Sequence, residues 1–102
     1  MNWISYLSET MFKFDLSEDL RKTIEVLKRK NSNLADQLNK KMKQIIESDN
    51  DTIDHYKNLR NELSDRKRVH VGENFVLIFK VNKQENKITF TDFEHKDTVY
   101  QH

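Results

Sequence analysis

The sequence contains no cysteine, and this absence excludes several kinds of chemistry. Disulfide bonds, thiolate catalysis and thiolate metal sites are all ruled out, and a reducing cytoplasm is compatible with the composition. No apolar run approaches the roughly 20 residues that a membrane-spanning helix needs. The first ten residues also lack the charged start and apolar centre of a signal peptide. We therefore expect a soluble protein of the cytoplasm that has no membrane partner.

Neither sign of charge is in large excess. The 102 residues include 18 lysines and arginines against 17 aspartates and glutamates, which gives a net charge of +1. A strongly basic body, the simplest sign of nucleic-acid binding, is therefore lacking. A slight cationic excess gathers between Asp54 and Gly72, where His55 and His70 are also found. With 35% hydrophobic residues, the chain has enough apolar side chains for one modest core and one domain.

Glycine occurs only once, at Gly72, and it divides the most informative stretch of the chain. Residues 74–81 are mostly β-branched or aromatic, which predicts a central strand that is buried on both faces. Residues 66–71 alternate instead, because successive side chains of a strand take opposite faces. Gly72 lies where a tight turn needs a residue that tolerates positive φ, so residues 66–81 are predicted to form a hairpin. Three cationic or protonatable groups would share one face of it: Arg66, Arg68 and His70.

The chain before this hairpin predicts a strand and two helices. Residues 12–16 alternate apolar and polar, which is typical of a half-buried strand. Ser17 is a suitable N-cap for a helix over residues 17–30, and acidic residues occupy the first turn. Residues 31–33 break the helical pattern, and a second amphipathic helix ends near Ser48. The two helices should form an antiparallel hairpin.

The remaining segments complete the expected fold. Residues 49–52 read as a polar loop, and residues 53–64 as a loop with some helical turns. Residues 82–86 form a turn before a last strand over residues 87–93. The order strand, helix, helix and three strands predicts an α+β fold, β-α-α-β-β-β. We expect an antiparallel-rich sheet of about four strands with the N-terminal helical hairpin packed on one side.

Several short motifs occur in this order of elements: Phe12-Lys13-Phe14 at the start, the Tyr-Lys-Asn-Leu-Arg run of residues 56–60, Arg68-Val69-His70-Val71 before the central strand, and Asp92-Phe93-Glu94-His95 near the end. Together they resemble the RelE/ParE superfamily of toxins from type II toxin–antitoxin pairs. The chain is most similar to the YafQ-like branch, whose histidines correspond here to His55, His70 and His95. The usual family start matches Met11, so the resemblance implies one toxin domain over residues 11–102 and an N-terminal extension over residues 1–10.

The resemblance implies a function and a set of partners. Family members are mostly ribosome-dependent endonucleases that cut mRNA and thereby inhibit translation. The implied partners are a cognate antitoxin, the ribosome and mRNA, and the implied oligomers form only through the antitoxin. The antitoxin would wrap the toxin with a segment that folds on binding.

Cutting RNA without a metal, by 2′-OH attack on the adjacent phosphate, needs a base, an acid and cations that stabilise the phosphate charge. Histidine suits both proton roles because its unperturbed pKa of about 6.5 lies near the operating pH. Our hypothesis is that His70 and His95 are the acid–base pair, in unassigned order, with His55 assisting. We expect these residues to converge on one sheet face with the phosphate-binding residues Lys57, Arg60, Arg66 and Arg68. Tyr100 either stacks on a base or packs against the sheet.

Other interpretations stay open. A histidine in a strand or loop is most often structural or solvated. A metal site built from His55, His70, His95 and His102 lacks any pair with short ligand spacing, so we expect no metal or other cofactor. A non-catalytic toxin, such as a ParE-like DNA gyrase inhibitor, or an inactive relative is the alternative function, because Val76 stands where many RelE-like toxins carry arginine. A plain helical-hairpin interaction domain is a third interpretation.

Overall fold

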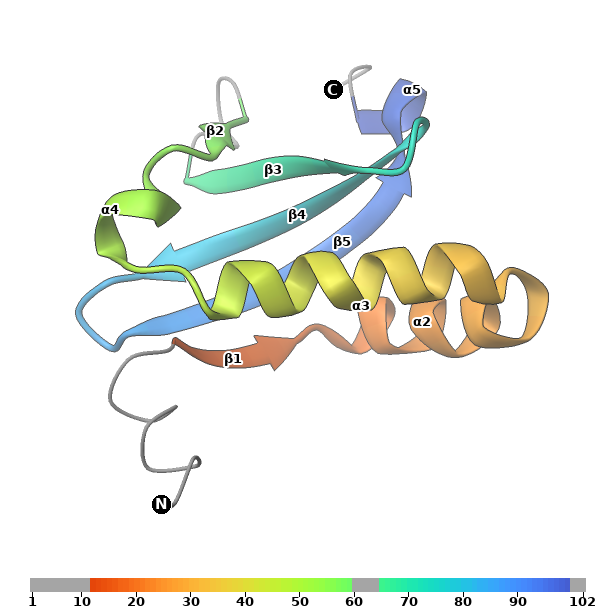
Figure 1. The fold of residues 1–102 in the computed structure, drawn as a ribbon, viewed down its shortest axis with the longest axis horizontal. Helices are drawn as coiled ribbons and strands as arrows, with labels where there is room; N and C mark the ends of the chain where they lie inside the picture. Colours follow the sequence, from red (N-terminus) through yellow and green to blue (C-terminus); the bar gives the residue numbers. More distant parts are fainter. Residues whose placement is uncertain (1–11, 60–64, 100–102) are drawn as a thin grey trace.

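The computed structural model describes residues 12–59 and 65–99, which form a five-stranded sheet with a helical hairpin on one face (Figure 1). The elements in chain order are β1 (Lys13–Leu16), α2 (Glu18–Lys30), α3 (Ser32–Ile46), α4 (Asn50–Ile53), β2 (Lys57–Asn58), β3 (Arg66–Val71), β4 (Phe75–Asn82), β5 (Lys87–His95) and α5 (Lys96–Val99). The strand order is β1-β5-β4-β3-β2, with β1 parallel to β5 and every other pair antiparallel. The predicted α+β class and antiparallel-rich sheet are confirmed. The extension predicted over residues 1–10 lies outside the described residues.

The two long helices begin at capping side chains. The Ser17 hydroxyl accepts a hydrogen bond from the N–H of Leu20 at 3.1 Å, as its N-cap assignment predicts. The Asn31 side chain does the same for the N–H of Leu34 at 3.2 Å. The break predicted over residues 31–33 is therefore a cap between two almost continuous helices.

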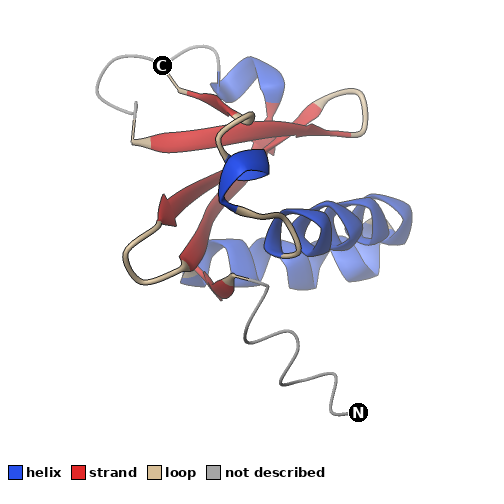
Figure 2. Ribbon diagram, turned by 60° about the vertical axis from the view of Figure 1, so that its left-hand side comes forward, coloured by secondary structure: helices blue, strands red, loops and turns tan. Residues whose placement is uncertain are grey.

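The helical hairpin packs on one face of the sheet and encloses the main core (Figure 2). Leu38 and Ile45 of α3 are fully buried against β4 and β5, where the rings of Phe79 and Phe90 lie 5.9 Å apart. On the opposite face, a smaller cluster joins Val76 and Ile78 of β4 to Val99 of α5. Since β4 is buried on both faces, its predicted central position is confirmed.

The sheet has five strands within residues 12–59 and 65–99, rather than the expected four or so. The extra strand is β2, which is only two residues long and therefore has no periodicity that a sequence pattern can show. The ammonium of Lys67 in β3 fixes it by donating to the Asn58 side chain at 3.0 Å. The prediction of a polar loop over residues 49–52 is wrong, because the short helix α4 forms there. Like β2, α4 is too short to show a periodicity in the sequence. The Asp49 carboxylate caps it by accepting the Thr52 N–H at 2.7 Å.

The turn between β3 and β4 confirms the predicted hairpin. Gly72 has φ of +66°, a left-handed conformation that side chains with a Cβ rarely adopt. A Cβ at this position would lie 3.2 Å from the Gln37 side-chain oxygen of α3. The single glycine is thus needed both for the turn and for the close approach of the second helix.

Candidate functional site

One face of the sheet carries most of the candidate residues, and cross-strand pairing defines which side chains belong to it. Val76 and Ile78 pack with Val99 of α5, not with the helical hairpin. Residues paired with them across the ladders point to the same side. We call this side the charged face, and the pairing assigns to it Lys57, Arg66, Arg68, His70, Val76, Ile78, Lys80, Asp92 and Glu94.

The cations of the charged face outnumber the carboxylates near β3. Arg68 pairs with Lys57 of β2 across the ladder, so the two cations lie side by side. Arg66 and Lys80 share one carboxylate, that of Asp65, at 4.0 Å and 3.6 Å. This part of the face therefore keeps an excess of positive charge. Three of the phosphate-binding candidates, Lys57, Arg66 and Arg68, thus lie on one face, and their role stays a prediction.

The guanidinium of Arg66 gives a further reason to expect an anionic ligand at this face. Its Nε atom is buried and has no hydrogen-bond partner within residues 12–59 and 65–99. A buried donor without an acceptor costs about 1–3 kcal/mol. An anionic oxygen arriving at this face would satisfy the donor, and phosphate oxygens are the acceptors that guanidinium groups bind most strongly.

His70 lies on the same face, two residues along β3 from Arg68. Its side chain is exposed, and it pairs with Val76 of β4. Val76 pairs in turn with Glu94 of β5, so His70 and Glu94 flank it on the same face. Two strand spacings separate their backbones by about 10 Å. Val99 of α5 packs over Val76, so His70 and Glu94 lie on either side of a covered position.

His95 does not join this group. It pairs with Phe75, the neighbour of Val76, and therefore lies on the helix-covered side of the sheet. Its ring stands edge-on to that of Phe75 with 5.5 Å between centroids, and its Nδ1 accepts the N–H of Asp97 at 3.2 Å. The Asp97 carboxylate is 3.6 Å from the same nitrogen. The expectation that His95 and His70 share one face is wrong.

The cause is a β-bulge in β5. Ile78 pairs with Asp92 but Phe79 pairs with Phe90, so Thr91 is an extra residue in the ladder. Every side chain after it changes faces relative to simple alternation, which moves Glu94 to the charged face and His95 away from it. The Thr91 hydroxyl donates to the Ile78 carbonyl at 3.2 Å and fixes the bulge.

His55 lies between α4 and β2. It follows α4, which stands beside the end of β4 in Figure 1. Its neighbour Asp54 is 2.7 Å from Lys83, in the turn after β4, and this hydrogen bond lowers the pKa of the Asp54 carboxyl. Two residues after His55, Lys57 pairs with Arg68, which lies two residues before His70 in β3. The convergence expected for His55 stays a prediction.

Three of the candidate residues lie outside the described residues, namely Arg60, Tyr100 and His102. Within the described ranges, no three His, Asp or Glu side chains are placed to hold a metal ion. In the same ranges, no helix is long and apolar enough to cross a membrane. Glu94 is not among the candidate residues that the sequence singles out. Its place on the charged face follows from the length of β5 and from the bulge.

Comparison with known proteins gives two similar sequences. The chain is 34% identical over 90 residues to the protein "Putative toxin RelE4" of Methanocaldococcus jannaschii, covering 88% of this chain and 92% of that protein. It is 29% identical over 90 residues to an uncharacterized protein of Methanosarcina mazei, covering 88% of this chain and 100% of that protein. No family model matches the sequence.

Solved structures share the fold. A mutant of the Escherichia coli toxin RelE in the free state matches with a TM-score of 0.68 at 21% identity, covering 89% of this chain and 92% of that one. The RelBE2 toxin–antitoxin complex of Mycobacterium tuberculosis matches with a TM-score of 0.68 at 11% identity, covering 85% and 93%. At these identities the similarity establishes the arrangement of helices and strands.

Proposed function

The chain belongs to the RelE family of toxins, and from this premise we propose that it is a ribosome-dependent endoribonuclease that cuts mRNA and so inhibits translation. The observation that carries the proposal is the composition of the charged face. Arg66, Arg68 and Lys57 gather there next to His70, which supplies a proton-transfer group beside cations. RNA cleavage without a metal needs both kinds of group at one phosphate.

The proposed reaction is attack of a ribose 2′-oxygen on the adjacent phosphorus. A base removes the 2′-OH proton, the new O–P bond forms, and the bond to the 5′-oxygen breaks as an acid protonates that oxygen. The products are a 2′,3′-cyclic phosphate and a 5′-hydroxyl. His70 is one proton-transfer group, while Arg66, Arg68 and Lys57 stabilise the charge that gathers on the phosphate oxygens.

The second proton-transfer group is either Glu94 or His95. Glu94 shares the charged face with His70 and lies across Val76 from it. His95 is at the same end of the sheet, but it faces the other way and its Nδ1 accepts the Asp97 N–H at the start of α5. The hydrogen bond to Asp97 gives His95 a structural role. We therefore favour Glu94 as the second proton-transfer group. His55, two residues before Lys57, stays the assisting group of the hypothesis.

The proposed partners follow from the family. One structure that shares the fold is a toxin–antitoxin complex, and we propose that this chain likewise pairs with an antitoxin and forms oligomers only through it. A ribosome-dependent nuclease acts where translation occurs, so the proposal includes a location in the cytoplasm. It requires no metal and no cofactor.

One observation favours a second function. Val76 at the centre of the charged face is fully buried and packs with Val99 of α5. This position offers no charge to a phosphate, whereas many RelE-like toxins carry an arginine there. A non-catalytic toxin, such as a gyrase inhibitor, is therefore the alternative that the experiment must separate from the nuclease.

The test is to map mRNA 5′ ends by primer extension after brief induction of the wild-type chain and of a His70→Ala variant. The proposal predicts new ends within translated regions for the wild type and none for the variant. Growth arrest without new ends would overturn it. A change in DNA supercoiling under those conditions would then identify gyrase as the target.

A further inference from the structure

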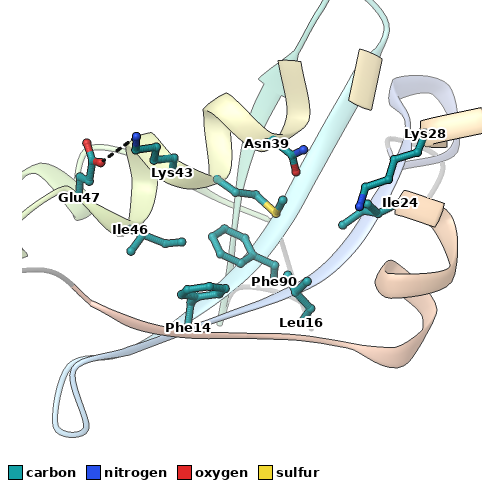
Figure 3. A pocket seen from close by; sticks show the side chains of 10 residues that line it. Phe14, Leu16, Ile24, Lys28, Asn39, Lys43, Ile46, Glu47 and Phe90 are labelled. Atoms are coloured by element: carbon teal, nitrogen blue, oxygen red, sulfur yellow. Dashed lines mark ion pairs between the residues drawn. The ribbon is translucent and has the colours of Figure 1, made fainter. Parts of the chain in front are cut away.

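An apolar groove lies between β1 and the helical hairpin, on the side of the sheet away from the charged face (Figure 3). Its volume is about 650 Å³. Phe14 of β1 stands at its edge with 57% of its surface exposed, and Val26 is the other large apolar side chain that the described residues expose. The apolar lining consists of Phe14, Leu16, Ile24, Met42, Ile46 and Phe90. A groove with such a lining is suited to an apolar segment.

The same groove borders a strand with an unused edge. Within residues 12–59 and 65–99, β1 pairs only with β5. The N–H of Lys13 donates to the carbonyl of Asn86, in the turn before β5, at 2.9 Å. The N–H of Ser17 donates to the carbonyl of Phe90 in β5, also at 2.9 Å. Alternation along the strand therefore directs the N–H of Phe14 away from β5. A free edge of this kind can pair with an extended segment.

We propose that this groove and edge are the docking site of the eleven residues that precede Phe12 in the same chain. The N–H of Phe12 donates to the Ile46 carbonyl at 3.0 Å, and Ile46 lines the groove. The preceding segment therefore starts at the mouth of the groove. Its sequence provides four large apolar side chains within five positions, Trp3, Ile4, Tyr6 and Leu7.

The length and the charge of residues 1–11 both fit the groove and the free edge of β1. The four residues of β1 extend about 13 Å. If residues 9–11 turn the chain back, residues 3–8 extend for roughly 20 Å and reach the whole length of β1. Lys28 and Lys43 lie at the rim of the groove, and the only charged side chain of the segment is the acidic Glu9. Glu47 also lines the groove, and its carboxylate forms an ion pair with Lys43 at 3.9 Å, so the groove carries two lysines against one carboxylate. A partner that binds the same groove would have to displace the segment first.

Trp3 makes the proposal directly measurable because it is the only tryptophan in the chain. Its fluorescence emission and its quenching by acrylamide should be compared in the wild type, a Phe14→Ser variant, a Val26→Ser variant and a free peptide of residues 1–11. Phe14 and Val26 are both exposed, so neither substitution should unfold the protein. Val26 does not line the groove and provides the matched control.

The proposal predicts that Trp3 of the wild type emits at shorter wavelength than the peptide and is quenched several-fold less. Phe14→Ser should return both values towards those of the peptide, and Val26→Ser should leave them at the wild-type values. Wild-type values equal to those of the peptide would overturn the proposal, and so would protection that Phe14→Ser does not reduce. Protection that appears only with dimer formation would assign the groove to the segment of a second copy and would also overturn it.

Discussion

His70 and His95 lie at the same end of the sheet but on opposite faces of it. His70 pairs with Val76 and His95 with Phe75, and these two residues are adjacent in β4. Successive side chains of a strand point in opposite directions, so one phosphate cannot lie between the two imidazoles on the charged face. Glu94, which also pairs with Val76, becomes the nearest equivalent on that face.

The first prediction separates Glu94 from His95. Glu94→Gln should slow cleavage by about 10²-fold or more, because it removes a proton-transfer group and keeps the shape of the side chain. His95→Asn should keep most of the activity, because an Asn side chain can still accept the Asp97 N–H at the start of α5. The measurement is the single-turnover cleavage rate of ribosome-bound mRNA. The opposite pattern, with Glu94→Gln active and His95→Asn inactive, would restore the histidine pair.

The second prediction concerns the cations of the charged face. Arg68→Ala and Lys57→Ala should each weaken RNA binding and reduce the slope of log affinity against log salt by about 0.7, as expected for one phosphate contact on a single strand. Lys22→Ala is the matched control, because Lys22 lies on α2 beside Glu18, away from this face. Equal slopes for all four proteins would mean that the charged face does not contact phosphate.

The third prediction tests the turn between β3 and β4. Gly72→Ala should lower the free energy of unfolding by about 1–2 kcal/mol, because φ of +66° places its Cβ in a disfavoured conformation and close to Gln37. Gly72→Asn should cost less, since asparagine tolerates left-handed conformations better. Urea unfolding of the three proteins measures both values. A fully stable Gly72→Ala protein would show that the turn has another geometry.

The fourth prediction concerns acid pH. The hydrogen bond from Lys83 lowers the pKa of Asp54 below its ordinary value of 3.8. A carboxyl whose pKa is lower in the folded state stabilises the protein fully above its unfolded pKa, and this stabilisation is lost as pH falls through the folded value. The stability difference between wild type and Asp54→Asn should therefore be largest at neutral pH and shrink below about 3.8. NMR titration showing a pKa of Asp54 at or above 3.8 would contradict this.

Much of the fold could be predicted from local chemistry. Ser17 is a capping residue before an acidic turn, and the only glycine stands between two strand-like runs, so the helices and the central hairpin were assigned correctly. The strand β2 could not be predicted, because two residues have no periodicity. It forms only because β3 offers a free edge and Lys67 binds Asn58.

The site could be predicted only in part. Arg66, Arg68 and His70 lie on one face because β3 alternates regularly, and this alternation is visible in the sequence. The error for His95 comes from the bulge at Thr91, which reverses the faces of the last residues of β5. A bulge depends on how two strands pair, and the sequence of β5 alone does not contain that information.

The most direct test of the account uses purified protein and ribosomes stalled on a defined mRNA. We predict that the wild-type chain cuts the ribosome-bound mRNA, that His70→Ala cuts it about 10²-fold or more slowly, and that Lys22→Ala retains the wild-type rate. Thermal unfolding should show that both variants remain folded, since both side chains are exposed. Cleavage by His70→Ala at the wild-type rate, or no cleavage by the wild type, would contradict the account.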